Sequence, residues 1–244
     1  MTRPVTRLSA VLSLVLLAAC SVPQTQGAAA PGPSAARVET ELTPAEAAQN
    51  FISVAQHMEP EIERECQART RGRSCDYQIM VDDRPGQEPN AFQTEDRQGR
   101  PILAFNLALI ASVRNQDELA FVMGHEAAHF IMGHLDAKAQ DAAAGAVIMG
   151  VLAAASGADA RGISQAQDIG AEVGGRAYSK DYELEADRLG TIITWDAGYD
   201  PLKGAEFFRR LPDPGNVFLG THPANGLRLD IVRRTVAQLK AGTI

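Results

Sequence analysis

The sequence has a shortage of basic residues. Lysine and arginine number 23 against 30 aspartates and glutamates, which gives the 244 residues a formal net charge of −7. Phosphate binding needs a basic surface, so nucleic acid is excluded as the main partner and a protein or peptide partner is expected instead. The length is sufficient for one sizeable domain with its own core.

Apolar runs long enough to span a bilayer as a helix are also lacking. The first run, from Leu8 to Ala19, is too short and follows Arg3 and Arg7, a pattern typical of an export signal. The second run, residues 142–158, is apolar all round but contains three glycines and also falls short of a span. This second run predicts a buried or lid helix, with a membrane-facing loop as the alternative.

Cysteine is scarce, and the first cysteine is informative. The letters "LAAC", which end at Cys20, resemble a bacterial lipobox, and this resemblance implies removal of residues 1–19 and acylation of Cys20. An ordinary signal peptide with a chance cysteine is the alternative. Acyl chains would anchor the protein stably, and Ser21, by resemblance to lipoprotein sorting rules, indicates the outer membrane, facing the periplasm. Residues 20–43, rich in Pro, Ala, Gly and Ser, predict a flexible linker to a domain of residues 44–244.

The other two cysteines, Cys66 and Cys75, form an even pair in a chain that we expect to be exported. The oxidising periplasm favours a disulfide between them. This bridge would close a short loop and act as a local staple, and a pair of metal ligands is the alternative.

The secondary-structure signals predict a mainly α-helical α+β fold with a small β-sheet. Thr43, followed by Pro44 and by Glu46, is a helix start signal. Helical patterns fill most of the rest of the domain. Two or three strands are predicted within residues 77–83, 90–95 and 100–106.

Histidine is rare, but three of the five histidines lie within residues 125–134. His125 and His129 are one helical turn apart, so both imidazoles lie on one helix face with their Cβ atoms about 6 Å apart, as two ligands of one metal require. Asn115 is placed to cap this helix. Glu126 lies about 100° around the helix, where it can reach an activated water without being a ligand.

These residue types predict a particular chemistry. Neutral imidazoles suit Zn²⁺, which brings the attacking water toward a pKa of about 7, and Glu126 can take the water's proton and pass it to a leaving amine. The pattern therefore predicts peptide hydrolysis with one zinc ion per chain. The alternative is a core helix that happens to carry histidines.

A zinc site of this kind needs a third protein ligand. Metzincins place a third histidine six residues after the second, where this chain has Leu135. His134 is one residue early and, on an ideal helix, points about 140° away from His129. It is therefore expected to end the helix or to support a ligand from behind.

A glutamate from a later helix is the remaining option for the third ligand. Glu183 and Asp187 are one turn apart, so one helix face offers a carboxylate to the metal and a second one to orient a ligand histidine. A plain ion pair of Asp187 with an arginine such as Arg228 is the alternative. Glu185 lies on the opposite side of that helix and is expected to be solvated or paired with Arg188.

Four motifs together carry a family resemblance. With "PNAF", "HEAAH", "ELEAD" and "THPANGLR" in this order, the sequence resembles the gluzincin metallopeptidases of the HtpX and CAAX prenyl protease type. The resemblance extends from about Pro44 to the C-terminus and implies a zincin-like domain with an HEXXH helix. The residues implied are the zinc ligands His125, His129 and Glu183, the base Glu126, and Asp187 behind a ligand.

The resemblance also implies roles for the outer two motifs. Asn90, Ala91 and Phe92 would form an edge strand along which a substrate backbone pairs. His222 would stabilise the oxyanion or act as a removable fourth ligand that keeps the enzyme latent. Arg228 would hold that segment in place.

Members with transmembrane helices differ from this chain, which shows none after its signal. It is similar to the soluble periplasmic lipoprotein members, BepA-like or LoiP-like, and we expect no tetratricopeptide repeats. The expected function is a zinc endopeptidase acting on misfolded or unassembled envelope proteins, with outer-membrane proteins and their assembly machinery as partners. The alternative is a zinc-retaining chaperone or assembly factor for outer-membrane proteins with little proteolysis.

Overall fold

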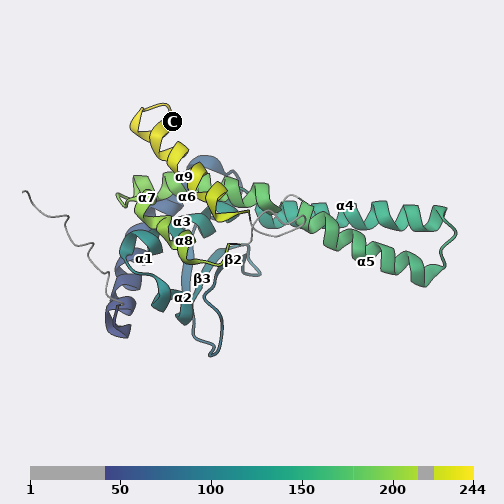
Figure 1. Ribbon diagram of the computed structural model, residues 1–244, viewed down its shortest axis with the longest axis horizontal. Coiled ribbons are helices and arrows are strands. Elements are labelled where there is room, and N and C mark those ends of the chain that lie inside the picture. Colours follow the sequence, from purple (N-terminus) through teal and green to yellow (C-terminus); the bar gives the residue numbers. More distant parts are fainter. Residues whose placement is uncertain (1–41, 178, 214–222) are drawn as a thin grey trace, which may run out of the picture. The chain divides into compact units, whose positions relative to one another are not determined.

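A computed structural model describes residues 42–177, 179–213 and 223–244 (Figure 1). This part of the chain is mainly helical with one small sheet, so the predicted α+β fold class is confirmed. The elements are α1 (Pro44–Arg69), β1 (Gln78–Asp82), β2 (Ala91–Glu95), β3 (Pro101–Asn106), α2 (Leu107–Ser112), α3 (Gln116–Ile131), α4 (His134–Ala155), α5 (Ala160–Ala177), α6 (Ser179–Asp196), α7 (Pro201–Gly204), α8 (Glu206–Arg210) and α9 (Asn225–Lys240).

Helix α1 begins where the start signal predicts. The Thr43 side chain accepts a hydrogen bond from the Glu46 backbone, and the Glu46 carboxylate accepts one from the Thr43 backbone. The apolar face of α1 is buried against α3. At its end, Cys66 is joined to Cys75 by a disulfide.

The disulfide-closed loop contacts the helix that carries the histidines. Arg73 donates to the Phe130 carbonyl oxygen at 3.0 Å and packs over the Phe130 ring. It also pairs with Asp136 at 2.8 Å, at the start of α4. The loop therefore supports the junction between α3 and α4.

The three strands form a sheet in the order β1-β3-β2. Strand β1 is parallel to the central strand β3, and β2 is antiparallel to β3. Strand β2 consequently lies at an edge of this sheet, has no partner on its other side among the described residues, and contacts α3. The edge strand predicted around Asn90 is thus placed beside the helix that carries the histidines.

Helix α3 lies in the centre of the core, and α6 packs closely on it. At the closest point Gly124 of α3 faces Gly190 of α6, and a Cβ on Gly190 would lie 2.8 Å from the His125 backbone nitrogen. The two helices approach this closely because neither residue has a side chain. This approach brings the first half of α6 alongside the histidines of α3.

Helices α4 and α5 form a hairpin that packs mainly against itself (Figure 1). The expectation that residues 142–158 are buried is wrong for the face of α4 that points away from α5. There Val147, Ile148, Val151 and Leu152 are 55–63% exposed. Within the described residues, no helix has both the length and the apolar character needed to cross a membrane.

Gly190→Ala should destabilise the protein. The added methyl group must displace the α3 backbone, and overpacking of this kind costs about 1–3 kcal/mol, which outweighs a gain of about 1 kcal/mol in helix propensity. Urea unfolding should therefore show a lower free energy of unfolding. Gly226→Ala is the control, because a Cβ there meets no atom of the described residues within 4 Å. Equal free energies of unfolding for Gly190→Ala and Gly226→Ala would contradict the close packing of α3 and α6.

Candidate metal centre

The two histidines of α3 point toward α6. The Asn115 side chain caps α3 by accepting a hydrogen bond from the Glu118 backbone at 3.0 Å. One turn apart, His125 and His129 bring their Nε2 atoms to 3.1 Å from each other. Such a short contact places both Nε2 atoms beside the same small volume.

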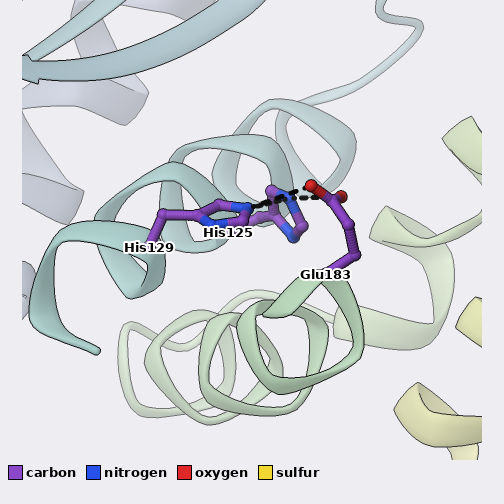
Figure 2. Close-up of side chains that lie close together, drawn as sticks. All are labelled: His125, His129 and Glu183. Carbon is purple, nitrogen blue, oxygen red and sulfur yellow. Dashed lines mark hydrogen bonds and ion pairs between the residues drawn. The ribbon is translucent and has the colours of Figure 1, made fainter. Parts of the chain in front are cut away.

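The Glu183 carboxylate of α6 completes the cluster (Figure 2). Its two oxygens lie 3.5 Å from His125 Nε2 and 3.5 Å from His129 Nε2. One ligand atom from each of the three residues lies within 4.8 Å of the others. Two imidazoles and one carboxylate on three sides of one point fit Zn²⁺, which takes three protein ligands in catalytic sites.

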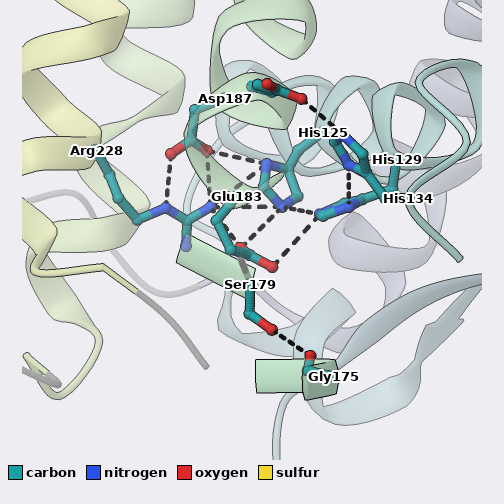
Figure 3. Close-up of polar contacts among 9 residues, drawn as sticks. His125, His129, His134, Gly175, Ser179, Glu183, Asp187 and Arg228 are labelled. Carbon is teal, nitrogen blue, oxygen red and sulfur yellow. Dashed lines mark hydrogen bonds and ion pairs between the residues drawn. The ribbon is translucent and has the colours of Figure 1, made fainter. Parts of the chain in front are cut away.

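A buried ion pair lies behind His125 (Figure 3). Asp187 is fully buried, and its Oδ1 is 2.9 Å from His125 Nδ1. Arg228 of α9 donates to both carboxylate oxygens, at 2.7 and 2.8 Å, and its guanidinium stacks over Phe208. Asp187 therefore contacts both a ligand histidine and an arginine, so the two predicted roles are compatible. Contact with Asp187 leaves His125 Nε2 facing the metal position.

The cluster shifts the pKa values of its members. Burial alone would raise the pKa of Asp187, but Arg228 and His125 outweigh it and hold that pKa below its usual range. Burial and the neighbouring His125 lower the pKa of His129 to about 3, so His129 is neutral, as a ligand must be. Burial lowers the pKa of His125 as well, but Asp187 and Glu183 outweigh it and raise the pKa to about 9.

His134 lies behind the second histidine. Its Nδ1 is 2.9 Å from His129 Nδ1, its Nε2 is 3.1 Å from the Glu185 carboxylate, and its ring stacks on Tyr182. Glu185 is exposed, as expected, but its carboxylate also contacts His134, a partner that the sequence did not predict. Both imidazoles of the cluster therefore have a carboxylate behind them, reached directly in one case and through His134 in the other.

The direction of His134 follows from a break in the helix. An ideal helix through residue 134 would turn this side chain away from His129. Instead α3 ends at Ile131, and Gly133 adopts a left-handed conformation with φ 72°, which suits a residue without a Cβ. His134 then starts α4 and turns back toward His129.

The cluster lies at the wall of a cavity of about 550 Å³. Glu126 also lines this cavity, one position after His125 on the same helix. Asn90, just before β2, and Ala91 and Phe92 of β2 also line it, and Phe207 and Phe208 of α8 form an apolar wall. The cavity thus combines three potential metal ligands, a further carboxylate and the edge strand of the described sheet.

Two of the predicted site residues cannot be placed. Cys20 and His222 lie outside the described residues. Arg228, in the same motif as His222, is placed, and it contacts Asp187.

Comparison with known proteins places the chain in a family. The family model for peptidase family M48 matches residues 52–236, which include every residue of the cluster. The chain belongs to peptidase family M48. This M48 peptidase is therefore a metallopeptidase, and its two histidines and glutamate are the candidate metal site in the described part of the chain.

Two curated relatives match part of this M48 chain. One, from Yersinia pestis, is named beta-barrel assembly-enhancing protease and is 32% identical over 148 residues, which are 54% of this chain and 30% of the relative. The other, from Vibrio cholerae serotype O1, is assigned the same name provisionally and is 30% identical over 121 residues, 46% of this chain and 24% of the relative. The chain thus matches less than a third of either relative.

His134→Ala should weaken zinc binding. Loss of the group that orients His129 should lower zinc affinity about 10- to 100-fold, as for other residues behind metal ligands. Competition titration against a chelator measures this affinity. His57→Ala is the control, because His57 contacts the Ala197 carbonyl oxygen and none of the cluster. An unchanged zinc affinity in His134→Ala would show that His129 needs no such support.

Proposed function

We propose that this M48 peptidase is a zinc-dependent endopeptidase that cleaves misfolded or unassembled envelope proteins in the periplasm. The observation that carries the proposal is the convergence of His125, His129 and Glu183 in a cavity that Glu126 also lines. A zinc ion held there would supply the Lewis acid that acidifies the attacking water to a pKa of about 7.

Glu126 is the proposed general base. It accepts a proton from the attacking water, and the water oxygen bonds to the substrate carbonyl carbon. As the carbon–nitrogen bond breaks, Glu126 passes that proton to the leaving amine nitrogen. Asp187 and His134 hold the two histidines in the orientation that this step needs.

The unpaired edge of β2 is the proposed place for the substrate backbone. An extended peptide can add to a sheet edge through main-chain hydrogen bonds, and such pairing does not depend on particular side chains. Strand β2 fits this role because it is an edge strand of the described sheet and lines the cavity. Cleavage of many sequences, as a quality-control enzyme requires, follows from backbone recognition. The role of His222 in oxyanion stabilisation or latency stays a prediction.

Glu126→Gln should abolish proteolysis and retain zinc. Removal of a general base lowers turnover by about 10²- to 10⁴-fold, while the three ligands remain. Metal analysis and casein digestion, measured side by side on the purified chain, check both parts. Glu172→Gln is the matched control, because Glu172 is exposed and pairs with Arg176 on α5. Retained cleavage in Glu126→Gln would refute the mechanism.

A second candidate is a zinc-retaining chaperone or assembly factor for outer-membrane proteins. The names of the two relatives, which mention assembly enhancement of β-barrels, favour it. The same variant separates the candidates. Rescue of a deletion strain by Glu126→Gln indicates a binding role, whereas failure to rescue indicates that cleavage is required.

Cys20 is the proposed lipid anchor to the outer membrane. Cys20→Ser should therefore abolish incorporation of labelled palmitate and move the protein from the membrane fraction to the soluble periplasmic fraction. Cys66→Ser with Cys75→Ser is the control, because these residues form the disulfide and should leave labelling intact. Palmitate incorporation into Cys20→Ser would exclude the anchor.

A further inference from the structure

Helix α4 carries an apolar face that no described element covers. Val147, Ile148, Val151 and Leu152 are each more than half exposed, and they follow one another at the spacing of a helix turn. Isolated exposed apolar side chains are ordinary, but a contiguous apolar strip on a protein surface marks an interaction site.

The packing of the hairpin explains why this face stays open. Gly145 of α4 lies against Gly170 and Gly174 of α5, and a Cβ on any of the three would overlap the backbone of the opposite helix. The inner face of α4 is thus occupied at very close range. Helix α5, by contrast, exposes mainly polar residues, Arg161, Ser164, Gln165, Asp168 and Glu172, together with two apolar ones, Ile169 and Val173. Most of the exposed large apolar side chains of the hairpin therefore lie on α4.

The apolar face begins at the metal-site cavity. Leu135, in the first turn of α4, lines the cavity and is 43% exposed. From Leu135 the exposed row continues at every fourth residue through Ala139, Ala143, Val147 and Val151. Neighbours at this spacing touch on a helix surface, and each step turns about 40° around the axis. The row therefore forms one apolar path that winds from the cavity to the far part of the hairpin.

We propose that this path, the exposed row of α4 from Leu135 to Val151, is a second binding site for the polypeptide substrate. Its occupant is an apolar segment of an unfolded chain of which another segment lies in the cavity. The inference rests on the proposed endopeptidase function and extends it, because it names exposed apolar sequence as the feature by which substrates are selected.

The shape and chemistry of the path suit unfolded chains. Its side chains are small or medium aliphatic groups on a convex helix, which present no deep pocket for one particular side chain. Burial of apolar area is non-directional, so many sequences can bind provided that they are apolar. A folded protein, with its apolar residues inside, offers no such segment.

The charge of the hairpin disfavours a lipid surface as the occupant. Residues 135–177 contain five acidic and three basic residues and no tryptophan, tyrosine or phenylalanine. Helices that lie in membrane interfaces carry basic polar faces and bulky aromatic anchors, and this hairpin has neither. The path is continuous with the cavity, on the other hand, and a polypeptide that occupies both sites requires this continuity.

The length of the path allows the proposal to be tested with substrates of different lengths. Val151 lies 16 residues after Leu135, about 24 Å along the helix. A peptide of about eight residues centred on its cleaved bond extends about 14 Å to either side and cannot reach Val151. A protein substrate can reach it, so the two substrates should respond differently to changes at the far end of the path.

The experiment compares wild type with Val147→Glu/Val151→Glu and Val147→Ser/Val151→Ser, each as the purified full chain. The substrates are unfolded casein and an eight-residue peptide taken from a casein cleavage site. Both double variants should raise KM for casein about five- to ten-fold with kcat unchanged, and should leave the peptide kinetics unchanged. Ser164→Glu/Gln165→Glu, which adds the same charge to the polar side of the hairpin, should leave both substrates unaffected.

An unchanged casein KM in both Val147/Val151 variants would overturn the proposal, as would equal losses for casein and peptide. Two other results would also overturn it if the casein KM of the Val147/Val151 variants is unchanged. Faster dissociation of these variants from phosphatidylethanolamine–phosphatidylglycerol vesicles would indicate that the path binds lipid. Loss of a dimer in sedimentation would indicate that it binds a second copy of the chain. If the wild type cleaves neither substrate, the proposed function fails, and the site is tested by anisotropy of labelled unfolded casein. Weaker binding by both Val147/Val151 variants then supports the site, and equal binding refutes it.

Discussion

The close approach of α3 and α6 is the constraint on which the metal centre depends. Gly124 and Gly190 let the two helix backbones come into contact, and this contact places Glu183 and Asp187 opposite His125. A side chain at either glycine would push the helices apart, and the three potential ligands would no longer share one point. Helix spacing here is therefore part of the chemistry of the site, and not only of the core.

Buried charge explains why the last helix takes part in the site. Asp187 is fully buried, and an unpaired carboxylate in that position would be very costly. Arg228 of α9 neutralises it through two hydrogen bonds. A buried ion pair contributes little net stability, so its value lies in the fixed orientation that it gives to His125. The C-terminal helix is thereby tied to a ligand on α3.

Helix α4 links the two surfaces that a substrate would meet. Its first residue, His134, supports His129, and its second, Leu135, lines the cavity. The rest of the helix carries the exposed apolar face outward. On its other side, Gly145, Gly170 and Gly174 let α4 and α5 pack backbone to backbone, so α5 covers only the inner face of α4.

The sequence by itself determined what depends on local spacing: the pair His125 and His129 on one helix face, the capped start of α1, and the mainly helical fold with a small sheet. Helix and turn geometry repeat from protein to protein, so residue spacing is sufficient for these features. Only the tertiary structure decided that His134 turns back to connect His129 with Glu185, because the left-handed Gly133 breaks the ideal helix. Likewise, composition made residues 142–158 apolar, but which of their faces is covered depended on where α5 packs, a long-range contact that periodicity does not encode.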